Sequence, residues 1–460
     1  MLWNGGSVSK TPPPPMNRLY PLVAALLALP AMVPAQDAGP DRFAFPSVED
    51  EATLPGVGPL RRYEGLMKRW PEVRAKWAAG AQQDREAVVF LGDSITQGWG
   101  TSLEKRFPGM KSANRGIGGD TTRGMLVRLR EDVLSLDPSA VVLLMGTNDL
   151  EIGLEPAVAA ENVKRILAAI KAHDPETPVV LCQVFPSSPE KKRPREKVQE
   201  LNRLYAGLVR GDAQVTLLDT WTLFAGPDGE ADPQWFPDLL HLNAAGYDRW
   251  ASGLRPVLAT LGFIETERVG SPNEEGFVSL FNGTDLTGWG FRPTPPRKPS
   301  KNPPKPDAPV FVEVAEAVNF DGKTESDDGR YAAINGRLVV KTPAEGRRIQ
   351  QLWTTEEFGG DFILKLEFRA TPNADSGVFI RQPQLQCRDY PLAGPYKDLK
   401  NYKPQDWNEL VVEGRGGKAR ATCNGELLEE AMEVPASGPI GLEGDRGQME
   451  YRHLRLKKLN

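Results

Sequence analysis

Apolar residues between positions 85 and 262 follow a repeating pattern, in which short continuous runs alternate with stretches that are apolar at every third or fourth position. The runs predict buried strands at residues 87–91, 139–145, 178–184 and 214–219. The stretches between them predict amphipathic helices, the last of which has Asn243 as its N-cap. A further helix is predicted at residues 62–80. Such alternation is typical of an α/β fold, whose parallel sheet is covered by helices on both faces.

The pattern changes after residue 276, where the helical spacing disappears. Short strand-like runs take its place, at residues 277–281, 337–340, 362–368, 377–380 and 409–412. Asn-Gly pairs at 282–283, 335–336 and 424–425 predict tight turns. This half is therefore expected to be an antiparallel β-sandwich, with an extended proline-rich loop at residues 293–309. The predicted divisions are an N-terminal extension (36–84), an α/β domain (85–262), a linker (263–275) and a sandwich domain (276–460).

The composition is that of a globular protein with two domains. With 460 residues, the chain exceeds what a single core ordinarily holds. A net charge of −5 argues against a dedicated nucleic-acid-binding protein, which would present a basic face. Cys182 lies in an apolar run and is expected to be buried. Whether Cys387 and Cys423 form a disulfide is not decided by the sequence. No Cys/His spacing resembles a metal site, and no cofactor is expected.

Residues 1–35 have the pattern of a secretory signal peptide. Arg18 precedes an apolar run at residues 22–29, and the segment ends at Ala35 with the small residue that a cleavage site requires. Residues 1–15 lack this pattern, so Met16 is an alternative start. A retained membrane anchor is disfavoured because the run is too short to cross a bilayer and Pro30 follows it. We therefore expect a secreted or periplasmic protein without a stable membrane anchor.

Four short segments carry groups suited to acyl transfer. Ser94 lies in a Gly-Asp-Ser turn after the first predicted strand, where α/β sheets bind their ligands. The glycine-rich segment 114–122 can bring backbone N–H groups close to a ligand, and Asn148 follows the next predicted strand, where its amide can donate to an oxyanion. His241, one of three histidines, follows Asp238 by three residues and can be the base that a serine nucleophile needs. Each segment alone has a simpler explanation as a turn, a helix cap or a surface residue. Four of them in order at strand ends favour a hydrolase.

These segments resemble the GDSL-like, or SGNH, hydrolase superfamily, and the second is especially similar to that of the catalytic subunits of platelet-activating factor acetylhydrolase. The resemblance covers residues 85–262 and implies a flavodoxin-like α/β fold. It implies that Ser94 is the nucleophile, that His241 is the general base and acid, and that Asp238 orients His241. It also implies an oxyanion hole formed by the N–H groups of Ser94 and Gly119, with Gly118 as the alternative to Gly119, and by the side chain of Asn148.

The second half resembles the 3-keto-disaccharide hydrolase domain family in the segments 277–289, 376–381, 407–409 and 438–443. The resemblance implies a concanavalin-like jelly-roll sandwich and a carbohydrate ligand. The chain departs from the family's pattern at residues 443–447, which hold no histidine, and at 384–386, which lack a glutamate. Sugar binding is the preferred role because glycosidases need a pair of carboxylates, which the sequence does not identify. Trp353, Tyr390 and Trp407 are candidates for stacking on sugar rings.

Together these observations predict a secreted serine esterase that removes small acyl groups, acetyl foremost, from an acylated carbohydrate. The reaction would pass through an acyl-enzyme that water hydrolyses, with no metal or cofactor. One alternative is a bifunctional esterase and 3-keto-disaccharide glycoside hydrolase. Another is a non-catalytic glycan-binding protein with a degenerate hydrolase domain, against which the intact set of Ser94, Asp238 and His241 argues.

Overall fold

The computed structural model describes residues 40–264, 270, 272–294, 313–342, 350–389 and 394–459. The predicted signal peptide at 1–35, the alternative start Met16 and most of the proline-rich loop at 293–309 lie outside these residues. Short 3-10 helices are found at η1 (Pro40–Phe43), η2 (Asp50–Thr53), η3 (Leu134–Leu136), η4 (Pro189–Lys191) and η5 (Gly394–Asp398).

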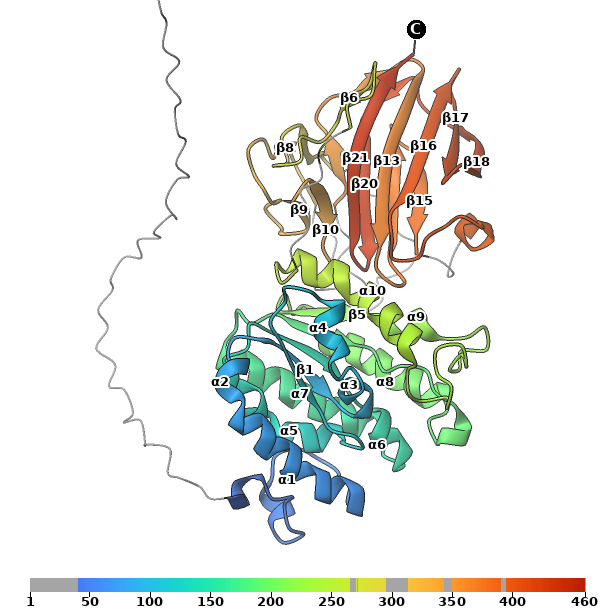
Figure 1. Ribbon diagram of the computed structural model, residues 1–460. Coiled ribbons are helices and arrows are strands. Elements are labelled where there is room, and N and C mark those ends of the chain that lie inside the picture. The colour runs from blue at the N-terminus through green and yellow to red at the C-terminus, as the bar shows by residue number, and fades with distance from the viewer. Residues whose placement is uncertain are drawn as a thin grey trace, which may run out of the picture. The chain divides into compact units, whose positions relative to one another are not determined.

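A parallel sheet of five strands, in the order β2-β1-β3-β4-β5, organises the first half of the chain (Figure 1). Its strands are β1 (Val88–Gly92), β2 (Ser112–Gly116), β3 (Ala140–Leu144), β4 (Val179–Cys182) and β5 (Val215–Leu218). Every residue of β1, β3 and β4 is buried, as expected for strands covered on both faces. The four strands predicted from apolar runs are confirmed as β1, β3, β4 and β5.

Strand β2 has no counterpart among the predicted strands. Its sequence Ser-Ala-Asn-Arg-Gly is polar, and it lies at the sheet edge, where β1 is its partner. Two of its three polar side chains are bonded inside the fold: Asn114 Nδ2 donates to Thr96 O at 2.9 Å, and Arg115 Nη2 lies 2.7 Å from Asp84 Oδ2. This strand is therefore held by hydrogen bonds that exist only in the folded chain. It lacks the apolar run from which a strand can be predicted.

Helices cover both faces of the parallel sheet (Figure 1). They are α1 (Glu64–Ala79), α2 (Ala81–Asp84), α3 (Ser94–Gln97), α4 (Ser102–Arg106), α5 (Thr122–Asp132), α6 (Thr147–Glu151), α7 (Pro156–His173), α8 (Arg195–Leu208), α9 (Thr220–Phe224) and α10 (Ala244–Thr260). Apolar residues of α5, α7 and α8 join the core on one face, and those of α3, α4, α9 and α10 join it on the other. The predicted cap of α10 is confirmed, because Asn243 Oδ1 accepts a hydrogen bond from Gly246 N at 2.8 Å.

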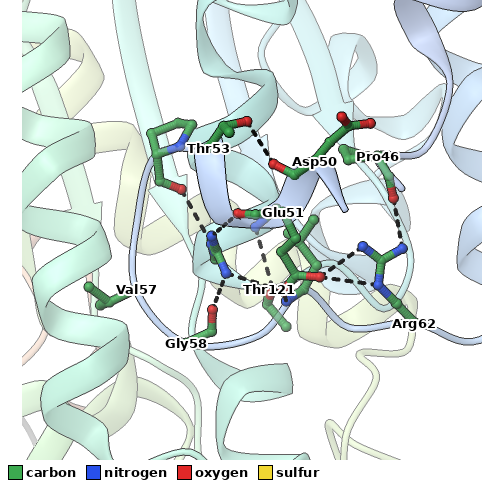
Figure 2. A network of polar contacts seen from close by, with 12 residues as sticks. Pro46, Asp50, Glu51, Thr53, Val57, Gly58, Arg62 and Thr121 are labelled. Carbon is green, nitrogen blue, oxygen red and sulfur yellow. Dashed lines mark hydrogen bonds and ion pairs between the residues drawn. The ribbon is translucent and has the colours of Figure 1, made fainter. Parts of the chain in front are cut away.

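The segment of residues 46–63 is bound to α5 and α7 by polar contacts (Figure 2). Arg123 of α5 donates to the backbone oxygen of Glu51 at 2.7 Å and forms an ion pair with the Glu51 carboxylate at 3.2 Å. Asn162 of α7 exchanges two hydrogen bonds with the backbone of Val57, at 2.8 and 3.0 Å. Although burial opposes the change, hydrogen bonds from Leu60 and Arg62 and the nearby arginine charges lower the pKa of Glu51, so it stays ionised at neutral pH.

The second half is built of antiparallel strands in two main sheets (Figure 1). One has the order β18-β17-β16-β13-β21-β10-β9, with β6 also paired to β21; the other has the order β15-β14-β20-β11-β7-β8; and β12 pairs with β19. The strands are β6 (Val278–Ser279), β7 (Trp289–Phe291), β8 (Val318–Asn319), β9 (Tyr331–Ile334), β10 (Arg337–Val340), β11 (Leu352–Thr354), β12 (Phe358–Gly359), β13 (Phe362–Ala370), β14 (Asp375–Ile380), β15 (Gln384–Arg388), β16 (Asn408–Arg415), β17 (Lys418–Cys423), β18 (Glu426–Glu433), β19 (Ser437–Gly438), β20 (Ile440–Arg446) and β21 (Met449–Lys458).

Alternating residues of the two main sheets form the sandwich core. Along β13 every second residue is buried, and Leu364 and Leu366 belong to the same core cluster as Val378 of β14. The predicted Asn-Gly turns at 335–336 and 424–425 are confirmed, since both residues of each pair have positive φ, between 49° and 81°. The fold of this half is therefore the all-β sandwich that the sequence predicts.

All three cysteines are free thiols. Cys182 is buried in β4, as its apolar surroundings predict. Cys387 and Cys423 do not form a disulfide in this structure, and burial raises the pKa of each thiol to about 12. Protonated, buried thiols of this kind are unreactive and contribute to packing.

Arg128 of α5 is fully buried and connects three segments at one end of the parallel sheet. Its Nε lies 2.8 Å from Asp120 Oδ2, and its Nη2 donates to the backbone oxygens of Gly92 and Arg115 at 3.1 and 2.9 Å. Burial raises the pKa of Asp120 to about 6 even though the adjacent Arg128 charge lowers it. The pair is therefore a buried ion pair at neutral pH, with hydrogen bonds to the ends of β1 and β2.

We expect Arg128→Leu to lower the free energy of unfolding by about 3 kcal/mol or more at pH 8, because it leaves the Asp120 carboxylate buried without its partner. The loss should be smaller at pH 5, since Asp120, whose pKa is about 6, is then largely protonated. Arg130→Leu, at an exposed position of the same helix, is the matched control and should change stability by about 0.5 kcal/mol or less. Urea unfolding at both pH values measures these differences, and equal losses for the two variants would contradict the role of the ion pair.

Candidate active site

Ser94, His241 and Asp238, which are far apart in the sequence, form one chain of hydrogen bonds. Ser94 Oγ lies 2.9 Å from His241 Nε2, and His241 Nδ1 lies 2.7 Å from Asp238 Oδ2. The other oxygen of Asp238 accepts hydrogen bonds from the backbone N–H groups of Leu240 and His241, at 3.0 and 2.7 Å. This arrangement allows His241 to take a proton from Ser94 while Asp238 fixes the orientation of the imidazole ring.

The environment of Asp238 keeps it ionised. Burial alone would raise the pKa of Asp238, but hydrogen bonds from the His241 ring and from the backbone of His241 and Leu240 lower it to about 2. The carboxylate therefore stays negatively charged at any pH near neutrality and can stabilise a positive charge on His241. Both side chains are nearly half exposed, at 47% for Asp238 and 44% for His241, so a substrate can reach them.

Ser94 begins helix α3 directly after β1. Asp93 caps this short helix, because its Oδ1 accepts a hydrogen bond from Ile95 N at 2.9 Å. The N–H of Ser94 lies in the first turn of α3, where backbone N–H groups have no partner within the helix. The Gly-Asp-Ser segment thus brings a hydroxyl group and a backbone donor to the carboxyl end of a central strand.

The glycine-rich segment after β2 presents Gly119 differently from Gly118. Gly118 N donates to Gln97 Oε1 at 2.9 Å, whereas no acceptor within the described residues takes the N–H of Gly119. Gly119 has a φ of +86°, and a Cβ on it would lie 2.3 Å from Tyr63 Oη. A side chain at Gly119 would therefore be strained and would clash with Tyr63. Of the two glycines weighed from the sequence, Gly119 has the free donor.

Asn148 lies inside helix α6, so it does not cap that helix. Its Nδ2 donates to Asp120 O at 2.9 Å, which uses one of the two hydrogens of the amide nitrogen. Its Oδ1 accepts hydrogen bonds from Arg61 Nη1 and Arg193 Nη2, each at 3.0 Å. The two guanidinium groups fix which way the amide faces, and the second Nδ2 hydrogen remains available to a ligand.

Arg61 and Arg193 were not among the candidates from the sequence. Arg61 comes from the segment bound to α5 and α7, and it also donates to Gly119 O at 3.2 Å and pairs with Glu151. Arg193 belongs to a basic run, residues 191–195, and side chains of this kind are ordinarily exposed to solvent. Its side chain is instead 3% exposed and donates to Thr147 Oγ1 at 2.9 Å. No sequence pattern marks this burial, because the partners come from distant segments.

These residues surround a cavity of about 620 Å³. It is lined by Arg61, Tyr63, Arg69, Ser94, Gln97, Gly118, Gly119, Asn148, Glu151, Glu190, Lys191, Lys192, Arg193, Asp238, Leu240 and His241. The size is that of a small-molecule site. Within the described residues, no three His, Cys, Asp or Glu side chains gather where they could hold a metal ion.

The other two histidines lie elsewhere in the fold. His173 is the last residue of α7, with Nε2 at 3.3 Å from Asp137 Oδ1. His453 lies in β21, with Nδ1 at 3.4 Å from Glu367 Oε2.

The three aromatic candidates of the sandwich half have different surroundings. Trp353 of β11 is partly exposed, and its ring lies 5.2 Å from that of Phe379. The guanidinium groups of Arg369 and Arg452 lie over the Trp407 ring at 4.8 and 4.1 Å. Tyr390 lies outside the described residues.

Around Trp353, the side of the sheet that faces away from the sandwich core carries polar side chains. Glu443 of β20 accepts hydrogen bonds from Gln351 Nε2 at 2.9 Å and from Gln384 Nε2 at 2.7 Å. Trp353 of β11 pairs with Gly441 of β20, and Glu443 lies two residues after Gly441. Because side chains alternate between the two faces of a sheet, Trp353 and Glu443 lie on the same face. The candidate residues from the sequence did not include this group of two amides and a carboxylate. The alternation of side chains along the strands is the one sequence pattern that could have indicated it.

Two protein families match the chain. Residues 90–249 match the GDSL-like Lipase/Acylhydrolase family, and residues 276–457 match the 3-keto-disaccharide hydrolase family, described as a 3-keto-alpha-glucoside-1,2-lyase-like domain. The chain therefore carries a GDSL-like hydrolase domain followed by a 3-keto-disaccharide hydrolase domain. No helix in the described part of the chain has both the length and the apolar character needed to cross a membrane.

Several known proteins are similar to part of the chain. Platelet-activating factor acetylhydrolase IB subunit alpha2 from Homo sapiens is 28% identical over 42% of this chain and 85% of its own length. The alpha1 subunit from Bos taurus is 28% identical over 45% of this chain and 90% of its own length. Among solved structures, a GDSL-like lipase from Bacteroides thetaiotaomicron is 26% identical, with a TM-score of 0.37, over 42% of this chain and 97% of its own. A lipase/acylhydrolase from Enterococcus faecalis is 21% identical, with a TM-score of 0.30, over 40% of this chain and 100% of its own.

We expect Arg61→Ala to lower kcat for an acetyl ester by on the order of tenfold, less than the loss of about 10²–10³ that removal of an oxyanion donor causes. The reason is that Arg61 contacts Asn148 Oδ1 and Gly119 O, so we expect it to act by holding these groups in place. Arg62→Ala is the matched control, because Arg62 anchors the same segment through Glu51 and does not contact Asn148. Steady-state kinetics in wild-type and Asn148→Ala backgrounds form a double-mutant cycle. An equally large Arg61→Ala effect in both backgrounds would mean that Arg61 does not act through Asn148.

Proposed function

We propose that this protein, which joins a GDSL-like hydrolase domain to a 3-keto-disaccharide hydrolase domain, is a serine esterase that removes small acyl groups, acetyl foremost, from carbohydrate. The observation that carries the proposal is the hydrogen-bond chain from Ser94 through His241 to Asp238, with distances of 2.9 and 2.7 Å, at a cavity of about 620 Å³. Acyl transfer needs an activated hydroxyl, an oriented base and donors for the oxyanion, and this cavity combines all three.

The proposed reaction has two steps. Ser94 Oγ attacks the ester carbonyl carbon while His241 Nε2 takes the hydroxyl proton, and the tetrahedral intermediate collapses as the bond to the sugar oxygen breaks. His241 passes its proton to that oxygen, which leaves as the sugar alcohol. Water then gives a proton to His241 and attacks the acyl-enzyme. As the second tetrahedral intermediate collapses, the bond to Ser94 Oγ breaks, His241 returns the proton to that oxygen, and the acid is released. Asp238, whose pKa is about 2, stays ionised through both steps and stabilises the imidazolium.

Three donors are proposed to hold the negative oxygen of the intermediates. They are the N–H groups of Ser94 and Gly119 and the second Nδ2 hydrogen of Asn148. The N–H of Gly119 is unused within the described residues, and the orientation of Asn148 is fixed by two arginines. Donors held in place before the reaction need no reorganisation as charge develops, which is why they lower the barrier.

A sugar ester is favoured over a lipid ester as the substrate by two features. The cavity is lined mostly by polar and charged side chains, with Leu240 as its one aliphatic lining residue. The second domain matches a family described by its action on a 3-keto-glucoside. In this proposal the sandwich binds the glycan on the sheet face of Trp353 and Glu443, where an aromatic ring and hydrogen-bonding groups are available to hold a sugar. The sequence of residues 1–35 supports export, and we propose a secreted or periplasmic location.

A second candidate function is that the sandwich also acts on 3-keto-disaccharides, giving a bifunctional enzyme. It is favoured by the family match over residues 276–457 and by the Glu443 carboxylate, which Gln351 and Gln384 hold in place. A glycosidase of the usual kind needs a second carboxyl group nearby, and none is identified in this group. Sugar binding therefore remains the preferred role, and assay of wild type and Glu443→Gln on 3-keto-disaccharides separates the two.

The esterase proposal predicts that Ser94→Ala abolishes hydrolysis of p-nitrophenyl acetate and of acetylated oligosaccharides, because the acyl-enzyme can no longer form. The expected fall in kcat is on the order of 10⁴ or more. Ser102→Ala, in α4 and outside the cavity lining, is the control and should keep wild-type rates. Release of acetate measures both variants, and equal rates for wild type and Ser94→Ala would refute the proposal.

For the sandwich domain, we expect Trp353→Ala to weaken binding of glycan fragments by about tenfold, since loss of a stacking ring of this kind costs about 1.4 kcal/mol. Trp407→Ala should instead lower the free energy of unfolding, because it removes the ring over which Arg369 and Arg452 lie. Calorimetric titration and urea unfolding of both variants make the comparison. Unchanged glycan affinity in Trp353→Ala would exclude this face as the binding site.

A further inference from the structure

The active-site cavity carries more positive than negative side chains. Its lining includes five arginines and lysines and three carboxylates, although the chain as a whole has a net charge of −5. Surplus positive charge in a cavity of an acidic protein is the opposite of what the composition alone predicts. Such a cavity attracts and holds anions.

Two of the five cationic groups already have carboxylate partners. Arg61 and Arg193 both pair with Glu151, and both donate to Asn148 Oδ1. Of the two remaining lining carboxylates, Asp238 is hydrogen-bonded to His241, and Glu190 is exposed. In the described part of the chain, no salt bridge joins Arg69, Lys191 or Lys192 to a carboxylate. Three positive charges at this cavity are thus without an acidic partner, and Glu190 can offset only one of them.

The backbone that carries the two lysines is anchored. Arg193 Nη1 donates to Lys191 O at 2.6 Å while its Nε donates to Thr147 O at 3.0 Å, so the loop is tied to α6. Ser188 Oγ accepts a hydrogen bond from Lys191 N at 3.4 Å and caps η4. The backbone that carries the two lysines is therefore already fixed at the cavity, and the entropy lost when they bind an anion is limited to their side chains.

Arg69 contacts Gly118, close to the nucleophile. Its Nη1 donates to Gly118 O at 3.1 Å. A Cβ built on Gly118 would lie 2.8 Å from Arg69 Nη1 and 3.6 Å from Ser94 Cβ, which places the guanidinium near the reacting hydroxyl. An anion bound by Arg69 would therefore lie within one sugar unit of the ester.

We propose that the substrate of this site is an acylated sugar that carries an anionic group, a carboxylate or a sulfate, bound by Arg69, Lys191 and Lys192. This inference rests on the proposed esterase function and adds the charge of the substrate to it. The shared chemistry is a negatively charged oxygen group on or next to the acylated sugar ring, which guanidinium and ammonium groups bind by charge-assisted hydrogen bonds.

The test compares an acetylated uronic acid oligosaccharide with its methyl ester, which has the same shape and no charge, and with a sulfated acetylated sugar. Binding to Ser94→Ala is measured by calorimetry, so the result does not depend on turnover. We expect the acid to bind about fivefold or more tighter than the methyl ester at low salt, with the ratio falling as NaCl is raised from about 0.02 to 0.5 M. The sulfated sugar shows which anion is preferred. Equal affinity for the acid and its methyl ester, with no gain for the sulfated sugar, would overturn the proposal.

The double variant Lys191→Gln, Lys192→Gln, made in the same Ser94→Ala background, should lower the ratio of acid to methyl ester affinity toward one. The matched control is Lys105→Gln, Lys111→Gln, which removes the same charge from two exposed lysines outside the cavity lining and should keep the ratio. Arg69 is left intact because it also holds Gly118 O. A ratio unchanged by the cavity variant, or lowered equally by the control, would contradict the assignment. Hydrolysis of p-nitrophenyl acetate by the wild type is assayed separately, so failure of the esterase function and failure of the anion preference give different results.

Discussion

The guanidinium group of Arg128 holds together the chain segments from which the proposed catalytic groups project. It binds the backbone at the end of β1, just before Ser94, the backbone at the end of β2, and the carboxylate of Asp120 in the glycine-rich segment. Asp120 in turn accepts a hydrogen bond from Asn148 through its backbone oxygen. Removing this buried charge would affect the proposed nucleophile and the proposed oxyanion donors together, because they depend on one set of contacts.

Burial around the site has an electrostatic cost. Burial raises the pKa values of Asp93 and Asp120 to about 6 and that of Asp149 to about 7. Because these values lie above those of an unfolded chain, the stability contributed by the protonated forms is fully present below about pH 4 and is lost as the pH rises through 6 to 7. Hydrogen bonds limit this loss, for example those from Thr122 to Asp149 at 3.0 and 2.6 Å. These carboxyl groups nevertheless hold loop and helix ends in place at the end of the sheet where the proposed active site lies.

The N-terminal extension belongs to the proposed active site as well as to the fold. Glu51 and Arg123 bind the segment to α5, and ten residues after Glu51 the same segment delivers Arg61 to Asn148. Tyr63 then covers Gly119 at the cavity, with its hydroxyl donating to Gly118 O at 3.1 Å. A residue more than fifty positions away in the sequence thereby fixes the orientation of Asn148, a proposed oxyanion donor. In the sandwich half, contacts from distant segments also distinguish two tryptophans. Trp353 lies on an open sheet face, whereas arginines cover the ring of Trp407.

The sequence by itself determined the α/β alternation, the sandwich and the triad candidates, because apolar period, turn chemistry and short motifs are local properties. Ser94, Asp238 and His241 could be named from motifs, and the turn at residues 424–425 from its Asn-Gly pair. Only the tertiary structure decided the rest. The edge strand β2, the burial of Arg193, the hydrogen bond that occupies the Gly118 N–H and the surplus positive charge at the cavity all depend on partners from distant segments. A polar side chain shows no local sign of whether water or a buried group will satisfy it, and for that physical reason these features become visible only in the folded chain.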